Sequence, residues 1–473
     1  MAQKLTIEPV TRIEGHARVT IHLDDNNNVE QAFMHVDQFR GFEKFSEGRM
    51  YYEMPVITPR ICGICPVSHH LASAKATDAV AGVTVPRPAD LLRRLLHKGQ
   101  MIQSHAMHFF HLASPDLLLG FDADPAVRNV VGLIEVNPEL ALKAVKLRKY
   151  GQEIIRRLSG RRIHMHWAVP GGVAAPLSLE DRDWILSQVD EMIGYIQEGI
   201  QIAKDWINAN MEVVTKFANF QTNYLGMVQK DGALELYDGE LRLVDKNGKL
   251  LEQFDGRKYL DYIAEHVEDW SYLKFPYYKK LGYPAGVYRV APLARLNVAD
   301  KISTPLAQKE FENFKALSEG PVEPSLFYHY ARLIETIYSL ERTRELCEDP
   351  DILSEDIRDM HVEITGEGVG IIEAPRGVLW HHYWTDANGV ITKVNLIVAT
   401  GGNNWAMNKA VDSVAKTFID GKNVTEGMLN RVEAAIRCYD PCLSCSTHAL
   451  GQMPLIVDIY DAQGECIKRY RRD

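Results

Sequence analysis

The sequence RICGICPVSH (60–69) contains two cysteines that are separated by two residues. The sequence DPCLSCSTH (440–448) repeats that spacing near the other end of the chain. Two intervening residues allow both sulfurs of a pair to face one metal ion, and the glycine after the first cysteine permits a tight turn. Thiolates are soft ligands that select zinc, copper(I), nickel or iron. The candidate metal ligands are therefore Cys62, Cys65, Cys442 and Cys445.

Three kinds of site contain such cysteine pairs. A structural zinc ribbon normally separates its pairs by about 15–20 residues, whereas 377 residues separate Cys442 from Cys65 in this chain. A thioredoxin-like redox pair follows a strand in a short βαβ unit, and neither pair has that context. The third kind is a catalytic metal held at the centre of a large protein. The cysteines alone leave all three open, although the long separation disfavours the zinc ribbon.

The chain has 473 residues, enough for one large multilobed domain or for two to three smaller ones. Its hydrophobic content of 46% and charged content of 25% are typical of a soluble globular protein. The net charge of −10 argues against a general nucleic-acid or membrane-surface binder, because both partners are anionic. There is no signal-peptide pattern and no run of 18 apolar residues, so we expect a cytoplasmic protein without a transmembrane segment. Seven cysteines, an odd number, do not indicate a disulfide framework.

Hydrophobic periodicity predicts an α+β fold that is predominantly α-helical. The longest helical patterns follow one another between residues 88 and 218, which predicts a bundle that buries its apolar stripes against itself. Short alternating runs around turn residues predict small peripheral hairpins. Helices are expected from Ser68 and over 88–113, 140–158, 178–218, 325–348, 405–419 and 425–437, and hairpins within the first 40 residues and over 233–254, 368–400 and 455–472.

Three further motifs accompany the cysteine pairs, namely PVTRIEGH (9–16), RGFE (40–43) and EAPRG (373–377). With the two cysteine motifs and the histidine that follows each, they resemble the large, catalytic subunit of nickel–iron hydrogenases. The motifs occur in the family's order over nearly the whole chain, and the sequence around the second cysteine pair is most similar to the bidirectional, NAD-linked cytoplasmic branch. The resemblance implies that family's fold, with the metal buried where both termini meet. It also implies reversible oxidation of hydrogen.

The resemblance further implies a nickel ion bound by all four thiolates, two of which also bridge to an iron that carries carbonyl and cyanide ligands. Cys62 and Cys442 would bind nickel terminally, and Cys65 and Cys445 would bridge the two metals. Four sulfurs provide the electron-rich, polarizable environment that a redox-active nickel requires. Hydrogen would bind at an open position between the metals and split heterolytically there.

Heterolytic splitting releases a proton, so a base must lie within hydrogen-bond reach. The resemblance offers the thiolate of Cys442 and the carboxylate of Glu14, which would begin the proton exit path; otherwise Glu14 is a surface or capping carboxylate beside Arg12. Arg376 resembles the family's arginine above the open metal site, and its alternative role is a salt-bridged structural arginine. Candidate acidic partners for Arg376, and candidate participants in catalysis, are Asp116 and Asp440.

Two further residues are expected to contact the metal centre. Thr400 occupies the position where the family has a hydroxyl that hydrogen-bonds to a cyanide. His69 follows Cys65 by four residues, about one helical turn, so we expect its ring to donate a hydrogen bond to that sulfur. The alternative for His69 is a core histidine with no role at the metal.

The family also has a separate magnesium site. Glu43 and His448 match its side-chain ligands, and a backbone carbonyl near Leu396 would complete the protein's contribution. A carboxylate with a single imidazole suits a partly hydrated octahedral ion. The alternative for Glu43 is an ordinary exposed carboxylate beside Lys44.

In the family an endopeptidase removes a C-terminal extension after the histidine of the second cysteine motif, once insertion factors have delivered nickel. By that resemblance 1–448 is the mature domain and 449–473 is a propeptide. The chain has no further cysteine cluster for iron–sulfur centres and no Gly-rich dinucleotide fingerprint, so electrons must leave through other subunits. The family supplies a small iron–sulfur subunit and, in this branch, an FMN-containing diaphorase module that reduces NAD(P).

Two other functions are to be distinguished from a hydrogenase. A quinone-oxidoreductase-type subunit of related fold has lost the metal, whereas this chain retains all four cysteines. A zinc-stabilised assembly scaffold would contain zinc in place of nickel and iron.

Overall fold

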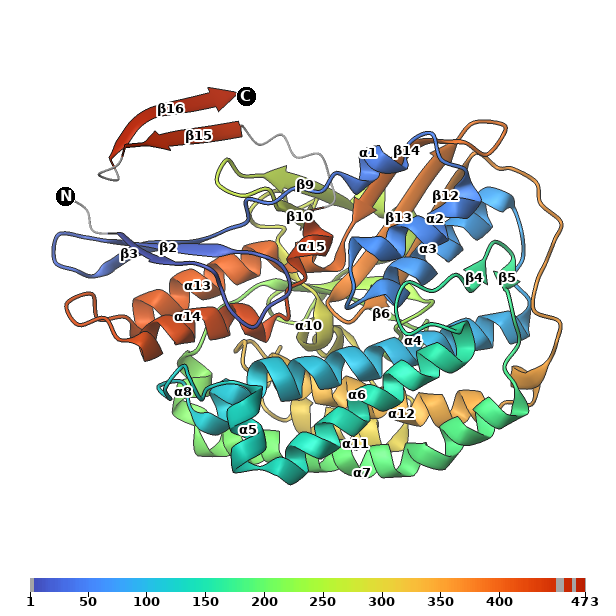
Figure 1. The fold of residues 1–473 in the computed structure, drawn as a ribbon, viewed down its shortest axis with the longest axis horizontal. Helices are drawn as coiled ribbons and strands as arrows, with labels where there is room; N and C mark the ends of the chain where they lie inside the picture. The colour runs from blue at the N-terminus through green and yellow to red at the C-terminus, as the bar shows by residue number, and fades with distance from the viewer. Residues whose placement is uncertain (1–3, 448–454, 462–464, 473) are drawn as a thin grey trace.

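The computed structural model describes residues 4–447, 455–461 and 465–472. Four long helices pack in a ring in the lower half of Figure 1, each against two of the others. The ring confirms the predominantly α-helical α+β fold with a bundle of long helices. Taken in order around the ring, so that each helix contacts the next, its members are α4 (Arg87–Met107), α6 (Pro138–Ser159), α7 (Leu179–Ala209) and α12 (Phe327–Glu348).

The apolar periodicity of these helices explains their packing. On α4, Leu92, Leu95 and Leu96 recur at helical spacing and are fully buried. The same helix continues past Met107 as a π-helical segment, His108–Ala113, so the expected extent of 88–113 is correct although its last turns are wider.

One helix expected over residues 178–218 is in fact two. Ser178 caps α7 as predicted, accepting a hydrogen bond from the backbone N–H of Asp181 at 3.1 Å. α7 then ends at Ala209, and the non-helical Asn210 separates it from the short α8 (Met211–Lys216).

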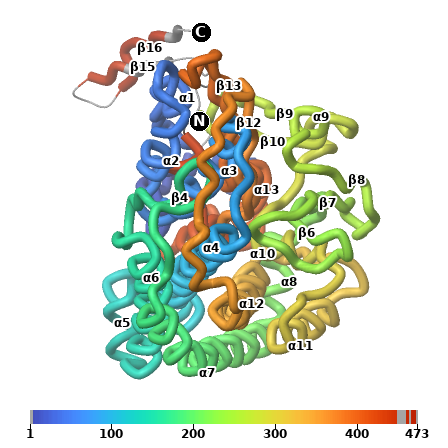
Figure 2. The backbone as a smooth tube through the Cα atoms, turned by 90° about the vertical axis from the view of Figure 1, so that its right-hand side faces the viewer, coloured from blue at the N-terminus to red at the C-terminus, as the bar shows by residue number. Residues whose placement is uncertain are grey.

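A three-stranded antiparallel sheet adjoins the bundle, with strands β12 (Glu367–Ala374), β13 (Gly377–Thr385) and β14 (Ile391–Ile397). Helix α3 (Pro66–Ala81) lies against β12 and β13, as Figure 2 shows from the side. Glycines make this close approach achievable, because a Cβ added at Gly370 would lie 1.9 Å from the carbonyl oxygen of Ala72. The sheet therefore holds α3, and with it the first cysteine pair, at a fixed position.

The remaining strands form small sheets at the periphery. Strands β1–β3 contact α13 through β3, and the terminal pair β15–β16 lies at the edge of the molecule in Figures 1 and 2. Their bounds are β1 (Lys4–Ile7), β2 (Arg18–Leu23), β3 (Val29–His35), β4 (Ala168–Val169), β5 (Gly172–Val173), β6 (Asn223–Val228), β7 (Glu240–Val244), β8 (Leu250–Phe254), β9 (Ile263–Val267), β10 (Lys274–Tyr278), β11 (Tyr288–Arg289), β15 (Leu455–Tyr460) and β16 (Cys466–Arg472).

The remaining helices are short or lie outside the ring of four. The two that lead to the second cysteine pair match the expected ranges closely. Their bounds are α1 (Phe42–Ser46), α2 (Met54–Ile57), α5 (Val130–Val136), α9 (Tyr259–Tyr262), α10 (Ala291–Val298), α11 (Pro305–Lys315), α13 (Asn404–Phe418), α14 (Glu426–Cys438) and α15 (Leu443–Ser446).

Two further local predictions were wrong. Helix α3 begins at Pro66 with Cys65 in the N-cap position, not at Ser68, because proline favours the first helical position. The region 368–400 contains three strands and not two, since a tight turn at Pro375 and Arg376 joins β12 to β13.

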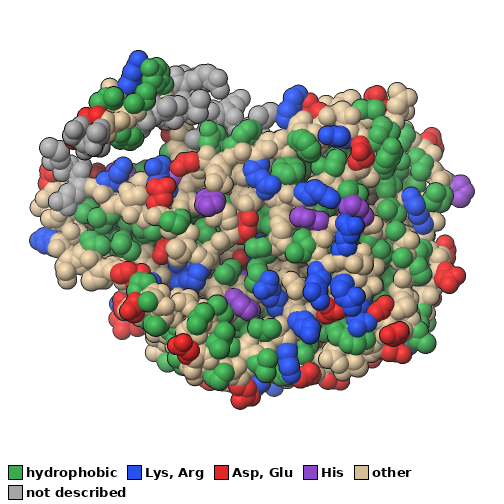
Figure 3. All heavy atoms as spheres, in the orientation of Figure 1, with side chains coloured by type: hydrophobic (Ala, Val, Ile, Leu, Met, Phe, Trp, Pro, Cys, Tyr) green, Lys and Arg blue, Asp and Glu red, His purple; other side chains and the backbone are tan. Residues whose placement is uncertain are grey.

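The surface shown in Figure 3 mixes charged, polar and apolar side chains. Among the helices of the described residues, none combines the length and the apolar character needed to cross a bilayer.

Candidate metal centre

The four motif cysteines meet in the interior although they come from the two ends of the chain. Their sulfurs all lie within 4.8 Å of one another. The separations are 3.2 Å for Cys62–Cys442, 3.5 Å for Cys65–Cys445 and 2.9 Å for Cys442–Cys445. Ligand sulfurs about 2.3 Å from one ion lie up to about 4.6 Å apart. The cluster therefore has the dimensions of a four-thiolate metal site.

Local backbone structure brings the two pairs together. Cys65 and Cys442 occupy the N-cap positions of α3 and α15, so each pair lies at a helix start. The N-terminal motif pairs with the second cysteine motif, because Glu14 forms a parallel β-bridge with Cys442. Gly15 permits this contact, since a Cβ there would lie 2.7 Å from Cβ of Leu443.

Ionisation of all four thiols would require a cation in the cluster. All four cysteines are buried. Burial raises the pKa of Cys442 and Cys445 well above the ordinary thiol value. Hydrogen bonds from the neighbouring sulfurs lower the pKa of Cys62. Because four adjacent buried thiolates repel one another, full ionisation needs a positive ion among them, and a soft metal satisfies this donor set.

A small cavity of about 10 Å³ adjoins three of the sulfurs, those of Cys65, Cys442 and Cys445. Its other walls are mostly apolar, with polar groups from a few side chains. The lining consists of Ser68, His69, Ala374, Arg376, Leu379, Val398, Ala399 and Thr400. The cavity is thus a small site beside the sulfurs, with polar groups from Ser68, His69, Arg376 and Thr400 at its wall.

Arg376 reaches the cluster from the turn between β12 and β13. Its Nε donates to the carbonyl oxygen of Asp440 at 2.6 Å, and one Nη donates to Oδ1 of the same residue at 2.9 Å. The other Nη lies 3.4 Å from Oγ of Ser104, a contact that no sequence motif indicated. Although burial alone lowers its pKa, Asp440 and three of the cluster sulfurs together raise the pKa of Arg376. A permanent positive charge therefore stands beside the thiols.

Asp440, and not Asp116, is the acidic partner of Arg376. Asp116 accepts from Nη1 of Arg437 at 2.8 Å and from Nδ2 of Asn430 at 3.0 Å, and it also pairs with Arg12. The two arginines hold the pKa of Asp116 low despite its burial. Asp116 thus ties the N-terminal motif to α14.

His69 contacts a different sulfur from the one that we expected. Its Nε2 lies 3.4 Å from Sγ of Cys445, on the other cysteine pair, and its Nδ1 lies 3.1 Å from Nε2 of His381. Helical spacing places His69 one turn beyond Cys65, but α3 directs the ring across the cluster.

Glu14 lies at the boundary of the site. Its Oε2 accepts from the backbone N–H of Ser444 at 3.1 Å, and its carbonyl oxygen accepts from the N–H of Leu443 at 3.1 Å. The side chain is partly exposed. Glu14 therefore contacts the second cysteine motif through both its backbone and its side chain, while part of its surface remains accessible to solvent.

Thr400 borders the cavity, and its hydroxyl oxygen accepts from the backbone N–H of Cys442 at 3.0 Å. Its hydroxyl proton remains available to a second acceptor in the cavity. The structure thus places Thr400 beside the sulfurs, as the resemblance implied.

Two of the expected magnesium ligands are neighbours. Oε1 of Glu43, on α1, accepts from the backbone N–H of Leu396 at 2.7 Å. Burial raises the pKa of Glu43, and nearby Lys274 opposes that shift. His448 lies outside the described residues.

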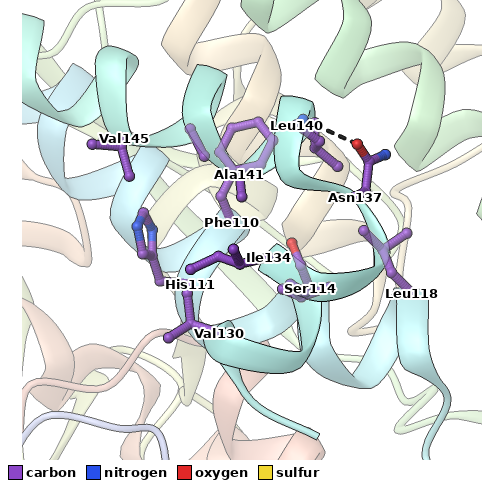
Figure 4. A pocket seen from close by; sticks show the side chains of 12 residues that line it. Phe110, His111, Ser114, Leu118, Val130, Ile134, Asn137, Leu140, Ala141 and Val145 are labelled. Atoms are coloured by element: carbon purple, nitrogen blue, oxygen red, sulfur yellow. Dashed lines mark hydrogen bonds between the residues drawn. The ribbon is translucent and has the colours of Figure 1, made fainter. Parts of the chain in front are cut away.

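A second pocket of about 40 Å³ lies between α5, α6 and the π-helical segment that follows α4 (Figure 4). Its lining is almost entirely apolar, and His111 is the one titratable side chain among its described residues. This pocket lacks a donor set for a metal, so the four-sulfur cluster is the candidate functional site.

Comparisons with known proteins match the parts of the chain that contain all four cysteines. A family model described as nickel-dependent hydrogenase matches residues 40–126 and 228–448, and one described as HoxL-like matches 4–39. The chain is 46% identical, over the full length of both, to the beta subunit of the NAD-reducing hydrogenase HoxS of Cupriavidus necator. It is 45% identical to one chain of the F420-non-reducing hydrogenase of Methanothermobacter thermautotrophicus, over 98% of this chain and 99% of that one. A crystal structure of an NAD+-reducing [NiFe]-hydrogenase in the H2-reduced state superposes with a TM-score of 0.92 at 45% identity, covering 94% of this chain and 99% of its own.

Proposed function

This chain belongs to the nickel-dependent hydrogenase family, and we propose that it is the catalytic subunit of an enzyme that reversibly couples H2 oxidation to NAD(P)+ reduction. The observation that carries the proposal is the buried cluster of four sulfurs within 4.8 Å of one another, beside the guanidinium of Arg376. A structural zinc ribbon needs neither the buried arginine nor the adjoining cavity.

The donor set fits a nickel–iron centre. By resemblance to the family, Cys62 and Cys442 would hold nickel terminally, and Cys65 and Cys445 would bridge to iron. The cavity borders Cys442 as well as the two proposed bridging cysteines, so small ligands could lie beside these three sulfurs. Its small, mostly apolar volume suits carbonyl and cyanide ligands, with hydrogen-bond donors from Arg376 and Thr400. When bound, this centre supplies the binding and heterolytic cleavage of H2.

Residues of this chain would stabilise the developing negative charge and transfer the released proton. Arg376, fixed by two hydrogen bonds to Asp440, places a positive charge where negative charge develops in the cavity. The thiolate of Cys442 is the first base, and Glu14 takes the proton onward because its backbone pairs with Cys442 and its side chain is partly exposed.

A magnesium ion is proposed at Glu43, with the backbone of Leu396 and the imidazole of His448. The support is the partly buried carboxylate in contact with that backbone. One equivalent of magnesium in the purified chain, lost in Glu43→Ala, is expected; a magnesium content that Glu43→Ala leaves unchanged would contradict the assignment.

Residues 449–473 are proposed as a propeptide removed after His448. The described part supports this, because Tyr460, Ile467 and Tyr470 of the β15–β16 hairpin are exposed, and a lone two-stranded hairpin is marginally stable in water. Its loss would leave the core intact. An endopeptidase would cut after nickel-insertion factors have acted, so the active chain should be 25 residues shorter by mass. A fully active chain of unchanged mass would contradict the proposal.

Electrons would leave through a small iron–sulfur subunit to an FMN-containing diaphorase in the cytoplasm. The NAD-reducing relative supports this, since it matches over its full length. The F420-non-reducing relative is almost as similar, so we assign the choice of electron acceptor to the partner subunits and not to this chain.

We expect the chain, purified with its partner subunits, to reduce NAD+ or NADP+ under H2 and to evolve H2 from NAD(P)H. Nicotinamide absorbance and gas analysis measure the two directions. Hydrogen uptake with an artificial dye but not with NAD(P)+ would overturn the nicotinamide coupling. No uptake with either acceptor would overturn the hydrogenase function.

Within the same complex, Glu14→Gln tests the proton route. Glutamine still accepts from the N–H of Ser444 but cannot take up a proton, so exchange between H2 and D2O should slow by about 100-fold or more. Nickel content should not change. Glu433→Gln is the matched control, since Glu433 accepts from Thr11 of the same N-terminal motif. Equal exchange rates in both variants would remove Glu14 from the route.

A further inference from the structure

The turn that carries Arg376 is held by a second buried arginine. Arg295 lies on α10 and is 0% exposed. Its Nη1 donates to the carbonyl oxygen of Ala374 at 2.9 Å, and its Nη2 donates to that of Pro375 at 3.2 Å. These two residues immediately precede Arg376 in the tight turn between β12 and β13. Arg295 therefore contacts the backbone of the turn, whereas Asp440 contacts the side chain of Arg376.

The guanidinium of Arg295 uses all five of its N–H groups. Besides the two bonds to the turn, Nε and Nη2 each donate at 2.6 Å to one carboxylate oxygen of Glu335 on α12. Nη1 also donates to Oε2 of Glu373 at 2.7 Å. Although burial alone raises it, the charge of Arg295 lowers the pKa of Glu335 to about 2, so this ion pair persists at neutral pH. Since five donors in a fixed planar fork all have acceptors, the guanidinium has a defined orientation.

The backbone position of Arg376 follows from these bonds. A peptide unit is planar, so a restrained oxygen at Pro375 also restrains the nitrogen and Cα of Arg376. The carbonyl oxygen of Glu373, just before the two that Arg295 holds, accepts from Nε2 of His97 at 2.8 Å. Side chains thus hold three consecutive carbonyl oxygens. The backbone is therefore restrained at the point where the side chain of Arg376 leaves it.

We propose that Arg295 is a positioning residue for Arg376, which holds the β12–β13 turn so that the guanidinium of Arg376 stands beside the sulfur cluster. The inference rests on the proposed function, because there Arg376 stabilises charge at the metal centre. Arg295 is not among the described residues that line the cavity, so it acts through Arg376. A displacement of about 1 Å in such a group can cost up to about 100-fold in rate.

Arg295→Lys keeps a positive charge between the two carboxylates, but one ammonium cannot also reach both carbonyl oxygens of the turn. We expect hydrogen uptake by the complex with its partner subunits to fall by about 10- to 100-fold. Nickel and iron contents should not change. A crystal structure of the variant should show the guanidinium of Arg376 displaced from Asp440. An Arg376 that keeps both bonds to Asp440 would overturn the proposal.

Arg376→Lys supplies the second background, since it removes the guanidinium that Arg295 is proposed to position. Arg295→Lys alone should shift the carbonyl and cyanide infrared bands and lower uptake. Added to Arg376→Lys, it should leave the bands in place and change uptake by less than about 2-fold. A purely structural role of Arg295 predicts the same fold loss with and without Arg376→Lys, and that result would overturn the proposal.

Arg93→Lys is the matched control. Arg93 is 1% exposed, pairs with both carboxylate oxygens of Asp78, and donates to the carbonyl oxygens of Val169 and Gly172 at the β4–β5 turn. Any loss that it causes should be equal in the two backgrounds, as for a general defect. A loss in this control that disappears in the Arg376→Lys background would overturn the proposal.

If Arg295→Lys does not fold, Glu335→Gln tests the same point. It keeps the size of the side chain but replaces one acceptor of Arg295 by an amide NH2, so the guanidinium loses orientation. Uptake should fall at the lower end of the same range, and only where Arg376 is present; an unchanged rate would overturn the inference. Absence of nickel and of carbonyl and cyanide bands from the unaltered complex would instead overturn the proposed function, and this inference with it.

Discussion

Cys442→Ser is expected to abolish hydrogen uptake and evolution and to prevent stable binding of nickel. Cys442 lies 3.2 Å from Cys62 and 2.9 Å from Cys445, so it is shared by both halves of the cluster. Structural zinc in zinc-finger peptides binds with an apparent free energy of about 10–16 kcal/mol. On that scale one of four ligands contributes on the order of 2.5–4 kcal/mol, roughly a hundred- to a thousand-fold in affinity. A serine oxygen is also a hard ligand that nickel disfavours here.

Nickel per chain, measured with H2/D2O exchange, tests this expectation. Cys347→Ser is the matched control, since Cys347 is a buried thiol on α12 outside the cluster. Full nickel content in both variants would remove Cys442 from the ligand set. Loss of nickel in both would indicate general destabilisation.

Arg376→Lys is expected to keep nickel and iron but to lower turnover by at least about 100-fold, the usual cost of one preorganised charge donor. The guanidinium uses Nε and Nη together on Asp440, and a lysine ammonium cannot make both bonds from one fixed position. The lysine would also leave the buried carboxylate of Asp440, whose pKa burial already raises, with a weaker partner.

Turnover and metal content should be measured on the same preparation. Arg289→Lys is a suitable control, because Arg289 is a buried arginine that donates to the carbonyl oxygen of Phe220 at 2.6 Å, away from the cluster. Unaltered turnover in Arg376→Lys would give Arg376 a structural role only. Equal losses in both variants would attribute the effect to a general defect of buried arginines.

The cysteine motifs and the helix bundle could be predicted because their signals are local. A two-residue spacing fixes the relation of Cys62 to Cys65, and the period of Leu92, Leu95 and Leu96 fixes the buried face of α4. The proline that starts α3 is also a local signal, but Ser68 offers a competing one, because a serine N-cap is common.

Contacts between distant segments could not be predicted in this way. His69 contacts Cys445 on the other cysteine pair, and Asp116 pairs with Arg12 and Arg437, because the docking of α3 and α14 decides which groups meet. Strand β6 was missed for a different reason. All six of its residues are buried, so it lacks the alternation that marks a half-exposed strand.

The most direct test is metal analysis with infrared spectroscopy on the chain purified with its partner subunits and maturation factors. We predict nickel and iron at about one equivalent each, with carbonyl and cyanide bands that vanish in Cys442→Ser. Zinc in place of nickel and iron, with no such bands, would contradict the account and leave the four cysteines as a structural site.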